Sequence, residues 1–333
     1  MAKKNTDSAE LARRLDGQVM VVPDLGRLMS HWPCGRNSHA SDIEGQVGEL
    51  LDRTASPRDK ENVEEANPAS LAACLWPNVS LEHLRTLTQM VLWQGRLDDY
   101  IEALEYENSE RAREFRAKTK EYVAQYLQLS DLPREPPATS AISDFQQVAQ
   151  VICRYYDQDQ RRALRVSLFE YIDSTVSEMR YIQSGEVPTD RYYEDLRKRT
   201  AGAGPLCALA EFVAGVQLSG LVTGSIPYKL MLEARKGRIF NVVPVLLWNG
   251  ERGELAEVVE HVVGEIEKAV KSFDVCESRL IRQYRGEADH IRLVAEALKT
   301  VCTGNLAWSL ESKRYRVGEP GEDGSLEQVL RAP

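Results

Sequence analysis

The sequence predicts an all-α protein that folds as a single helical domain. Strand-like alternation of polar and apolar residues is nearly absent from the 333 residues. No shift in composition divides the chain, so one domain is the simplest count. Apolar residues recur instead at helical spacing in segments 81–105, 145–183, 205–222, 241–248, 255–273 and 288–315.

Taken in order, the segments predict three parts of unequal length. Residues 1–30 are a polar lead-in with a short helical start, and residues 31–316 form the helical domain. Within that domain, Ser80 is the expected cap of a long helix, and Pro-rich residues 132–137 form a linker. Residues 317–333, rich in Gly, Pro and acids, are predicted to be a flexible tail.

Composition and charge exclude several classes of function. The net charge of −9, with basic residues interleaved among acids, argues against nucleic acid as a partner. No apolar run is long enough for a membrane span, and no apolar core follows Lys3 and Lys4, so we expect no secretory signal and a cytoplasmic protein. The six cysteines stand singly and are expected to be reduced thiols.

A group of acids occupies an unexpected place on the helix after Ser80. Its apolar stripe, continued at about 100° per residue, arrives at Asp98 and Glu102, with Asp99 on the same rim. Like charges at this spacing destabilise a helix, and burying them unpaired costs more. Mg²⁺ prefers carboxylate oxygens together with water and phosphate, so the group predicts a metal site for a diphosphate substrate. A solvated acidic helix end explains the same spacing and stays open.

This acidic motif and later landmarks resemble class I terpene cyclases. Residues 97–102 (Leu-Asp-Asp-Tyr-Ile-Glu) are similar to the D-D-x-x-[DE] metal motif. Residues 178–188 and 193–202 look like the E-x-x-R-x-x-G-x-x-P and Y-x-x-x-R-R-x-T-x-G stretches, and residues 308–315 are similar to the terminal W…R-Y element. The similarity is closest to fungal-type sesquiterpene cyclases and covers roughly residues 30–316.

The resemblance implies a class I terpenoid synthase bundle around a deep apolar cavity. It also implies a Mg²⁺-dependent sesquiterpene cyclase, holding up to about three ions when both metal sites are present. Such an enzyme ionises farnesyl diphosphate, releases diphosphate and cyclises the carbocation to a hydrocarbon or an alcohol. Product identity and oligomeric state do not follow from the sequence.

Basic residues are expected to hold the diphosphate. Arg197 is the candidate sensor because a guanidinium grips phosphate oxygens with paired donors. The second arginine of the family pair is Lys198 here, so either residue can have that role. The resemblance also implies that Arg314 and Tyr315 hold the leaving group from the other rim. Ordinary solvated helix ends are the alternative for both pairs.

Aromatic side chains are candidates for the wall of the cavity. Their faces can stabilise a carbocation by cation–π attraction. Each is equally typical of ordinary core packing. The candidates, besides Tyr315, are Trp93, Phe169 and Trp308.

The second metal motif of the family, N-D-x-x-S-x-x-x-E, is not intact. Its nearest counterpart, residues 225–233, keeps Glu233 as the last ligand, whereas Ser225 replaces Asn and Lys229 replaces Ser. Pro227 is expected to disturb a helix there. The interval from Arg197 is also short by roughly four turns of helix. Natural loss of the second site and a gene model lacking an exon-sized segment both explain this.

Two alternatives to an active cyclase therefore remain. One is a catalytically weakened terpene synthase homologue, and the other is a non-enzymic helical interaction protein. A prenyltransferase is disfavoured, because a second D-D-x-x-D motif is expected there and none occurs in the sequence. Hydrolase and nucleotide-binding signatures are also absent from the sequence.

Overall fold

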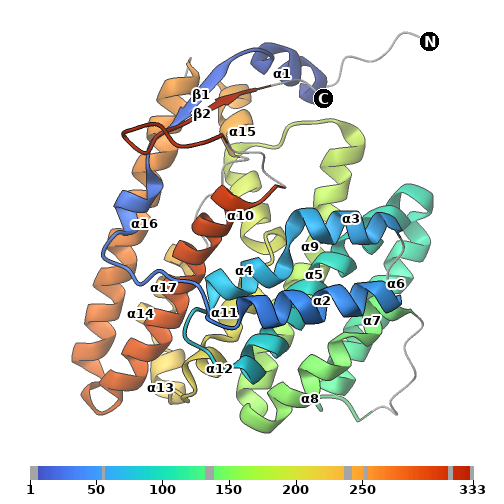
Figure 1. Cartoon of the computed structure of the whole chain (residues 1–333), viewed down its shortest axis with the longest axis vertical. Helices are drawn as coiled ribbons and strands as arrows, with labels where there is room; N and C mark the ends of the chain where they lie inside the picture. The colour runs from blue at the N-terminus through green and yellow to red at the C-terminus, as the bar shows by residue number, and fades with distance from the viewer. Residues whose placement is uncertain are drawn as a thin grey trace.

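The computed structural model describes residues 7–54, 57–131, 139–235, 242–250, 254–313 and 318–330. Those residues form helices and one small sheet (Figure 1). The 3₁₀ helices span Leu25–Met29 and Arg285–Glu287, and the strands are β1 (Val19–Val22) and β2 (Leu326–Val329). The α-helices are α1 (Asp7–Leu15), α2 (Ala40–Thr54), α3 (Pro57–Ala66), α4 (Pro68–Leu75), α5 (Leu81–Glu107), α6 (Ser109–Tyr126), α7 (Ser140–Ser143), α8 (Phe145–Tyr155), α9 (Gln158–Ser184), α10 (Asp190–Thr200), α11 (Ala203–Ala208), α12 (Ala210–Ala214), α13 (Gly220–Thr223), α14 (Ile226–Arg235), α15 (Val242–Asn249), α16 (Leu255–Gln283) and α17 (Ala288–Glu311).

The helices begin and end at residues with a local reason to do so. The Ser80 hydroxyl accepts a hydrogen bond from the first turn of α5, as the sequence predicts. Asp157 and Gln160 form a reciprocal capping box at the start of α9. That helix ends at Gly185, whose φ of 68° is the left-handed conformation that glycine adopts at low cost. The all-α, single-domain prediction is confirmed.

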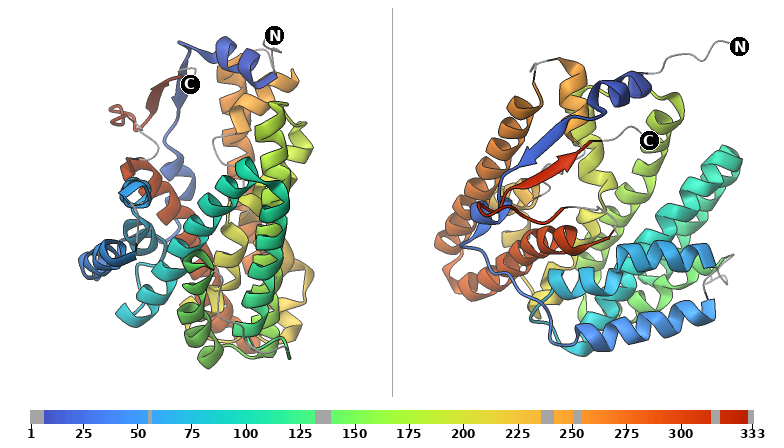
Figure 2. Two further views of the ribbon diagram at one scale, coloured as in Figure 1. Left: turned by 90° about the vertical axis from the view of Figure 1, so that its right-hand side faces the viewer. Right: turned by 45° about the horizontal axis from the view of Figure 1, so that its top comes forward.

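The core consists of three apolar clusters between the long helices. One joins α4, α5, α6, α8 and α9, and includes the buried Trp93 and Phe145. A second joins α14, α16 and α17 around Phe273. The third lies beneath β1, where Met20 packs with residues of α15 and α16. Figure 1 shows α16 at one side of the molecule and α6 at the other, and Figure 2 shows the same helices from two further directions.

Helices α4 and α17 approach each other unusually closely. A Cβ atom placed on Gly304 of α17 would lie 2.2 Å from the carbonyl oxygen of Cys74 in α4. No real Cβ tolerates such a distance, so only glycine fits at this contact.

The two ends of the described chain differ from the prediction. Strand β2 lies in the segment predicted to be a flexible tail, and it pairs antiparallel with β1, with Val19 opposite Val329. β1 turns Met20 and Val22 inward while Val19 is exposed. A four-residue alternation is too short to predict a strand, and its partner lies at the other end of the sequence.

Pro227 also behaves differently from the prediction. It lies in the first turn of α14, where a backbone N–H has no partner within the helix, and the helix therefore starts normally around it. Within the described residues, no helix combines the length and the apolar character needed to cross a membrane.

Candidate metal and diphosphate site

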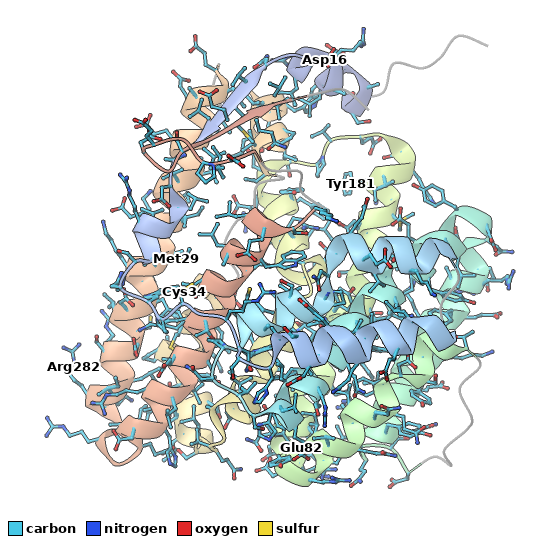
Figure 3. All side chains as sticks on the ribbon, in the orientation of Figure 1. Asp16, Met29, Cys34, Glu82, Tyr181 and Arg282 are labelled. Carbon is cyan, nitrogen blue, oxygen red and sulfur yellow. The ribbon has the colours of Figure 1, made fainter. Side chains whose placement is uncertain are left out.

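Four carboxylates gather where α5 and α9 pass each other, and we call Asp98, Asp99, Glu102 and Glu178 the acidic rim. Burial, and then the negative charges of Glu178, Asp99 and Glu102 in that order, together raise the pKa of Asp98 from 3.8 to about 7. The structure thus brings the three predicted acids together and adds Glu178 from α9. In Figure 3, the label on Tyr181, one turn beyond Glu178, marks the end of α9 nearest this rim.

One face of α5 changes from buried to exposed just before the acids. Leu84 and Thr88 on this face are buried, whereas Gly95, Asp99 and Glu102 are exposed. These residues share a face because side chains three, four and seven positions apart lie above one another on a helix. The buried face of the N-terminal half of α5 therefore continues, in its C-terminal half, as a surface that solvent or a ligand can reach.

Arg197 of α10 faces the acidic rim. Its Nη1 lies 3.0 Å from Oε1 of Glu178 and donates to the Thr200 hydroxyl at 3.2 Å. Lys198, one position later, lies 3.8 Å from Asp195 of its own helix. Of the two candidate sensors, Arg197 is the one that the structure places beside the acids.

The donor set of the acidic rim fits Mg²⁺ in kind. Mg²⁺ needs only one or two carboxylates when water and phosphate supply its other ligands. Burial is the first cause of the raised pKa of Asp98, and the charges of its acidic neighbours add to it. Across the described part of the chain, no three His, Cys, Asp or Glu side chains are already gathered around a single metal position.

The counterpart of the second metal motif is arranged differently. The Ser225 hydroxyl accepts a hydrogen bond from the Tyr228 backbone N–H at 3.4 Å, so Ser225 caps α14. Lys229 and Glu233 are exposed on α14, which packs against α16. The role of Glu233 as a metal ligand stays a prediction.

The three predicted aromatic residues of the cavity wall contact other parts of the protein. Trp93 is buried against Phe145, with ring centroids 4.7 Å apart. The Phe169 ring lies 5.8 Å from the charged ends of Lys120 and of Arg165. The indole N–H of Trp308 donates to the Ala66 carbonyl oxygen at 3.0 Å. Arg314 and Tyr315 lie outside the described residues.

Two further residues meet the acidic rim and were not predicted. Tyr171 of α9 lies beside Asp98, since the Asp98 charge is, after burial, the next cause that raises the pKa of the Tyr171 hydroxyl. Gln94 of α5 is buried one turn before Asp98. Glu178 opens one of the stretches that resemble the terpene cyclase landmarks, so its spacing could have identified it. Tyr171 and Gln94 carry no comparable signal, because each looks like an ordinary helical residue.

A cavity of about 370 Å³ lies between α1 and the adjoining ends of α15 and α16. Leu11 and Leu15 of α1 line it together with Leu247 and Leu255, and none of the predicted site residues is among its lining residues. The deep apolar cavity that the resemblance implies stays a prediction.

Comparisons with known proteins agree with this arrangement. Residues 89–234, which include the acidic rim and Glu233, match the family model described as terpene synthase family 2, C-terminal metal binding. Terpene synthase 1 of Tieghemostelium lacteum is 21% identical over 311 residues, covering 86% of both chains. The (-)-delta-cadinene synthase of Streptomyces clavuligerus is 22% identical over 312 residues, covering 85% of this chain and 93% of that one.

A solved structure gives the same picture of the whole chain. The linalool/nerolidol synthase of Streptomyces clavuligerus, in complex with 2-fluorogeranyl diphosphate, superposes with a TM-score of 0.70 at 18% identity. The match covers 85% of this chain and 98% of that one. These relatives come from an amoeba and a bacterium, and the fungal-type assignment stays a prediction. The chain has the all-α, single-domain fold of class I terpene synthases.

Proposed function

We propose that this chain is a Mg²⁺-dependent terpene cyclase that acts on farnesyl diphosphate in the cytoplasm. The observation that carries the proposal is the acidic rim on α5 and α9 with Arg197 of α10 paired to it at 3.0 Å. Negative groups that suit a metal and a positive group that suits a phosphate thus share one site. The match of residues 89–234 to a metal-binding terpene synthase family supports the same reaction class.

The residues divide the work of ionisation between them. Asp98, Asp99 and Glu102 hold Mg²⁺, which supplies positive charge against the departing diphosphate. Arg197 donates to phosphate oxygens and stabilises the same negative charge. The carbon–oxygen bond of the substrate breaks with both electrons leaving on diphosphate, and the prenyl carbocation then closes onto its own double bonds. The cyclic cation then loses a proton to give a sesquiterpene hydrocarbon, or adds water and loses a proton to give an alcohol.

A prenyl diphosphate is the substrate class that the comparisons support. The solved linalool/nerolidol synthase contains 2-fluorogeranyl diphosphate, and this chain shares its fold over 85% of its length. Farnesyl diphosphate is proposed over shorter and longer substrates because the sequence landmarks are nearest to sesquiterpene cyclases. Arg314 and Tyr315 are proposed, from the sequence alone, to hold the diphosphate with Arg197.

Incubation of the purified protein with geranyl, farnesyl and geranylgeranyl diphosphates and Mg²⁺ tests the proposal. We expect volatile cyclic products from farnesyl diphosphate by gas chromatography, and none without Mg²⁺. Circular dichroism must show a folded helical protein in the same preparation. A folded protein that yields no product from any of the three substrates would sink the proposed activity.

A weakened homologue is the second candidate, and the α14 segment favours it. Ser225 serves as a helix cap and Lys229 stands where a second oxygen ligand is expected. Such a protein binds Mg²⁺ and diphosphate at the acidic rim without efficient turnover. Calorimetric binding without product identifies this case, whereas a non-enzymic interaction protein shows neither binding nor product.

A further inference from the structure

Three segments of the chain meet at one buried point beneath the acidic rim. The Tyr171 hydroxyl of α9 donates to the main-chain carbonyl oxygen of Gln94 in α5 at 3.2 Å. Burial, and next the charge of the neighbouring Asp98 carboxylate, raise the pKa of this hydroxyl. The Gln94 side-chain amide donates to the carbonyl oxygen of Gly202 at 3.3 Å. Tyr171 and Gln94 are both buried, so these bonds form away from competing water.

Gly202 occupies the turn that follows Arg197. Its φ of 67° is left-handed, and a Cβ there would lie 3.3 Å from Gln94 Nε2 and 3.8 Å from a ring carbon of Tyr171. Two positions earlier, Thr200 accepts a hydrogen bond from the Arg197 guanidinium. Gln94 therefore holds the turn that immediately follows the helix bearing Arg197.

The same two residues hold the acidic side of the site. Tyr171 has a single hydroxyl hydrogen, and its neighbours are the Gln94 carbonyl and the Asp98 carboxylate, one turn apart on α5. A movement of α9 against α5 would break this contact. The position of Asp98 is thereby linked through Gln94 to the turn after Arg197.

We propose that Gln94 and Tyr171 are positioning residues that set the spacing between Asp98 and Arg197, so that both ends of a Mg²⁺–diphosphate group are held together. This inference rests on the proposed function. Neither residue is assigned a contact with the reacting atoms. Their effect is on how tightly the diphosphate and its metal bind as a unit.

A second buried tyrosine provides a matched control. The Tyr156 hydroxyl donates to the Ala208 carbonyl oxygen at 2.8 Å and accepts from the Phe212 N–H at 3.1 Å. Tyr156 is as buried as Tyr171 but touches neither the acidic rim nor the turn at Gly202 in the described contacts. Its replacement by phenylalanine removes a buried hydroxyl with no link to the site.

Calorimetric titration of inorganic diphosphate at saturating Mg²⁺ tests the inference. The full chain is compared with Gln94→Met, which keeps the length but removes the donor, with Tyr171→Phe, and with Tyr156→Phe. We expect Gln94→Met and Tyr171→Phe each to weaken diphosphate binding about tenfold or more and to raise the Mg²⁺ concentration needed for half-saturation. Tyr156→Phe should bind diphosphate within about twofold of the parent affinity, even though its melting temperature should fall by as much as that of Tyr171→Phe.

The possible failures can be told apart with Asp98→Asn as a reference. If Asp98→Asn abolishes binding while Gln94→Met and Tyr171→Phe bind like Tyr156→Phe, the positioning role is wrong and the proposed function stands. If the parent protein itself binds no diphosphate with Mg²⁺, the proposed function fails, and the positioning role fails with it.

Discussion

The acidic rim on α5 and α9 and the segment around α14 are the two places where the sequence resembles the metal motifs of class I terpene cyclases, yet their side chains are arranged in different ways. At the rim, burial and the repulsion between neighbouring carboxylates raise the pKa of Asp98 to about 7. At α14, Ser225 is satisfied as a helix cap and Glu233 stands exposed on a helix that packs against α16. One region stays electrostatically unfavourable without a cation, and the other is already satisfied by ordinary helix contacts.

The difference between the acidic rim and α14 indicates which of the two regions would be stabilised by a metal ion. A functional site commonly keeps an arrangement that costs stability until its ligand binds. A segment without such a role follows ordinary local rules, such as helix capping. We therefore infer that the acidic rim is the metal site and that α14 contributes little to it. Substitutions in the two regions should differ accordingly in their effects on turnover and on stability.

The largest expected effect comes from Asp98→Asn. The substitution removes the most perturbed carboxylate and one candidate metal ligand, so we expect turnover of farnesyl diphosphate to fall by about two orders of magnitude or more. The melting temperature of the metal-free protein should be unchanged or higher, because a like-charge contact is lost. Full turnover in this variant would show that the metal is bound elsewhere.

Arg197→Met should have the next largest effect, and Lys198→Met is its matched control. Removal of Arg197 takes away a paired phosphate donor and leaves Glu178 without its 3.0 Å partner, so we expect about a hundredfold loss of kcat/KM. Lys198 lies 3.8 Å from Asp195 on its own helix, and its loss should change kcat/KM by less than about fivefold. Equal losses in the two variants would contradict the assignment of Arg197 as sensor.

The stability of the metal-free protein should depend on pH through Asp98. Its pKa in the folded protein is about 7, against an ordinary value of 3.8, so the folded state holds the proton more tightly than the unfolded chain. This stabilisation is complete below pH about 4 and is lost as pH rises through about 7. Chemical denaturation across this range measures the loss, which Mg²⁺ should offset. An unchanged pH slope in Asp98→Asn would mean that another group causes the dependence.

The smallest effects are expected at α14. Ser225→Ala removes a helix cap and should lower the free energy of unfolding by about 1 kcal/mol with turnover nearly unchanged. Glu233→Gln should reduce turnover less than about tenfold, because Glu233 is exposed on α14, which packs against α16. If Glu233→Gln were instead as damaging as Asp98→Asn, α14 would supply a second metal ligand in the working enzyme, and the contrast between the two regions would fail.

Much of the fold could be predicted because its helices follow from local sequence patterns. Apolar spacing and the Ser80 cap define α5, and Gly185 ends α9 where the sequence breaks. The acids of the rim were found because charged residues interrupt an apolar stripe, which is also a local signal. Strand β1 was missed because four residues carry little periodicity and its partner is β2, at the other end of the chain.

The sequence could not predict which neighbouring residues the side chains of the site contact. Trp93 is predicted for the cavity wall, and the structure shows its ring packed on Phe145, a contact that the sequence does not specify. Tyr171 looks like a core tyrosine until α9 brings its hydroxyl to Asp98. A sequence gives the face of a helix that a residue occupies, but the neighbour that meets this face is set by packing among several helices.

The pairing of β1 with β2 also bears on the order of folding. Val19 pairs with Val329, so this sheet closes a contact between segments that lie far apart in the sequence. Contacts between nearer segments, such as α5 with α6, can form first, because contacts between distant segments close more slowly than local ones. We therefore expect the sheet to form after these nearer contacts.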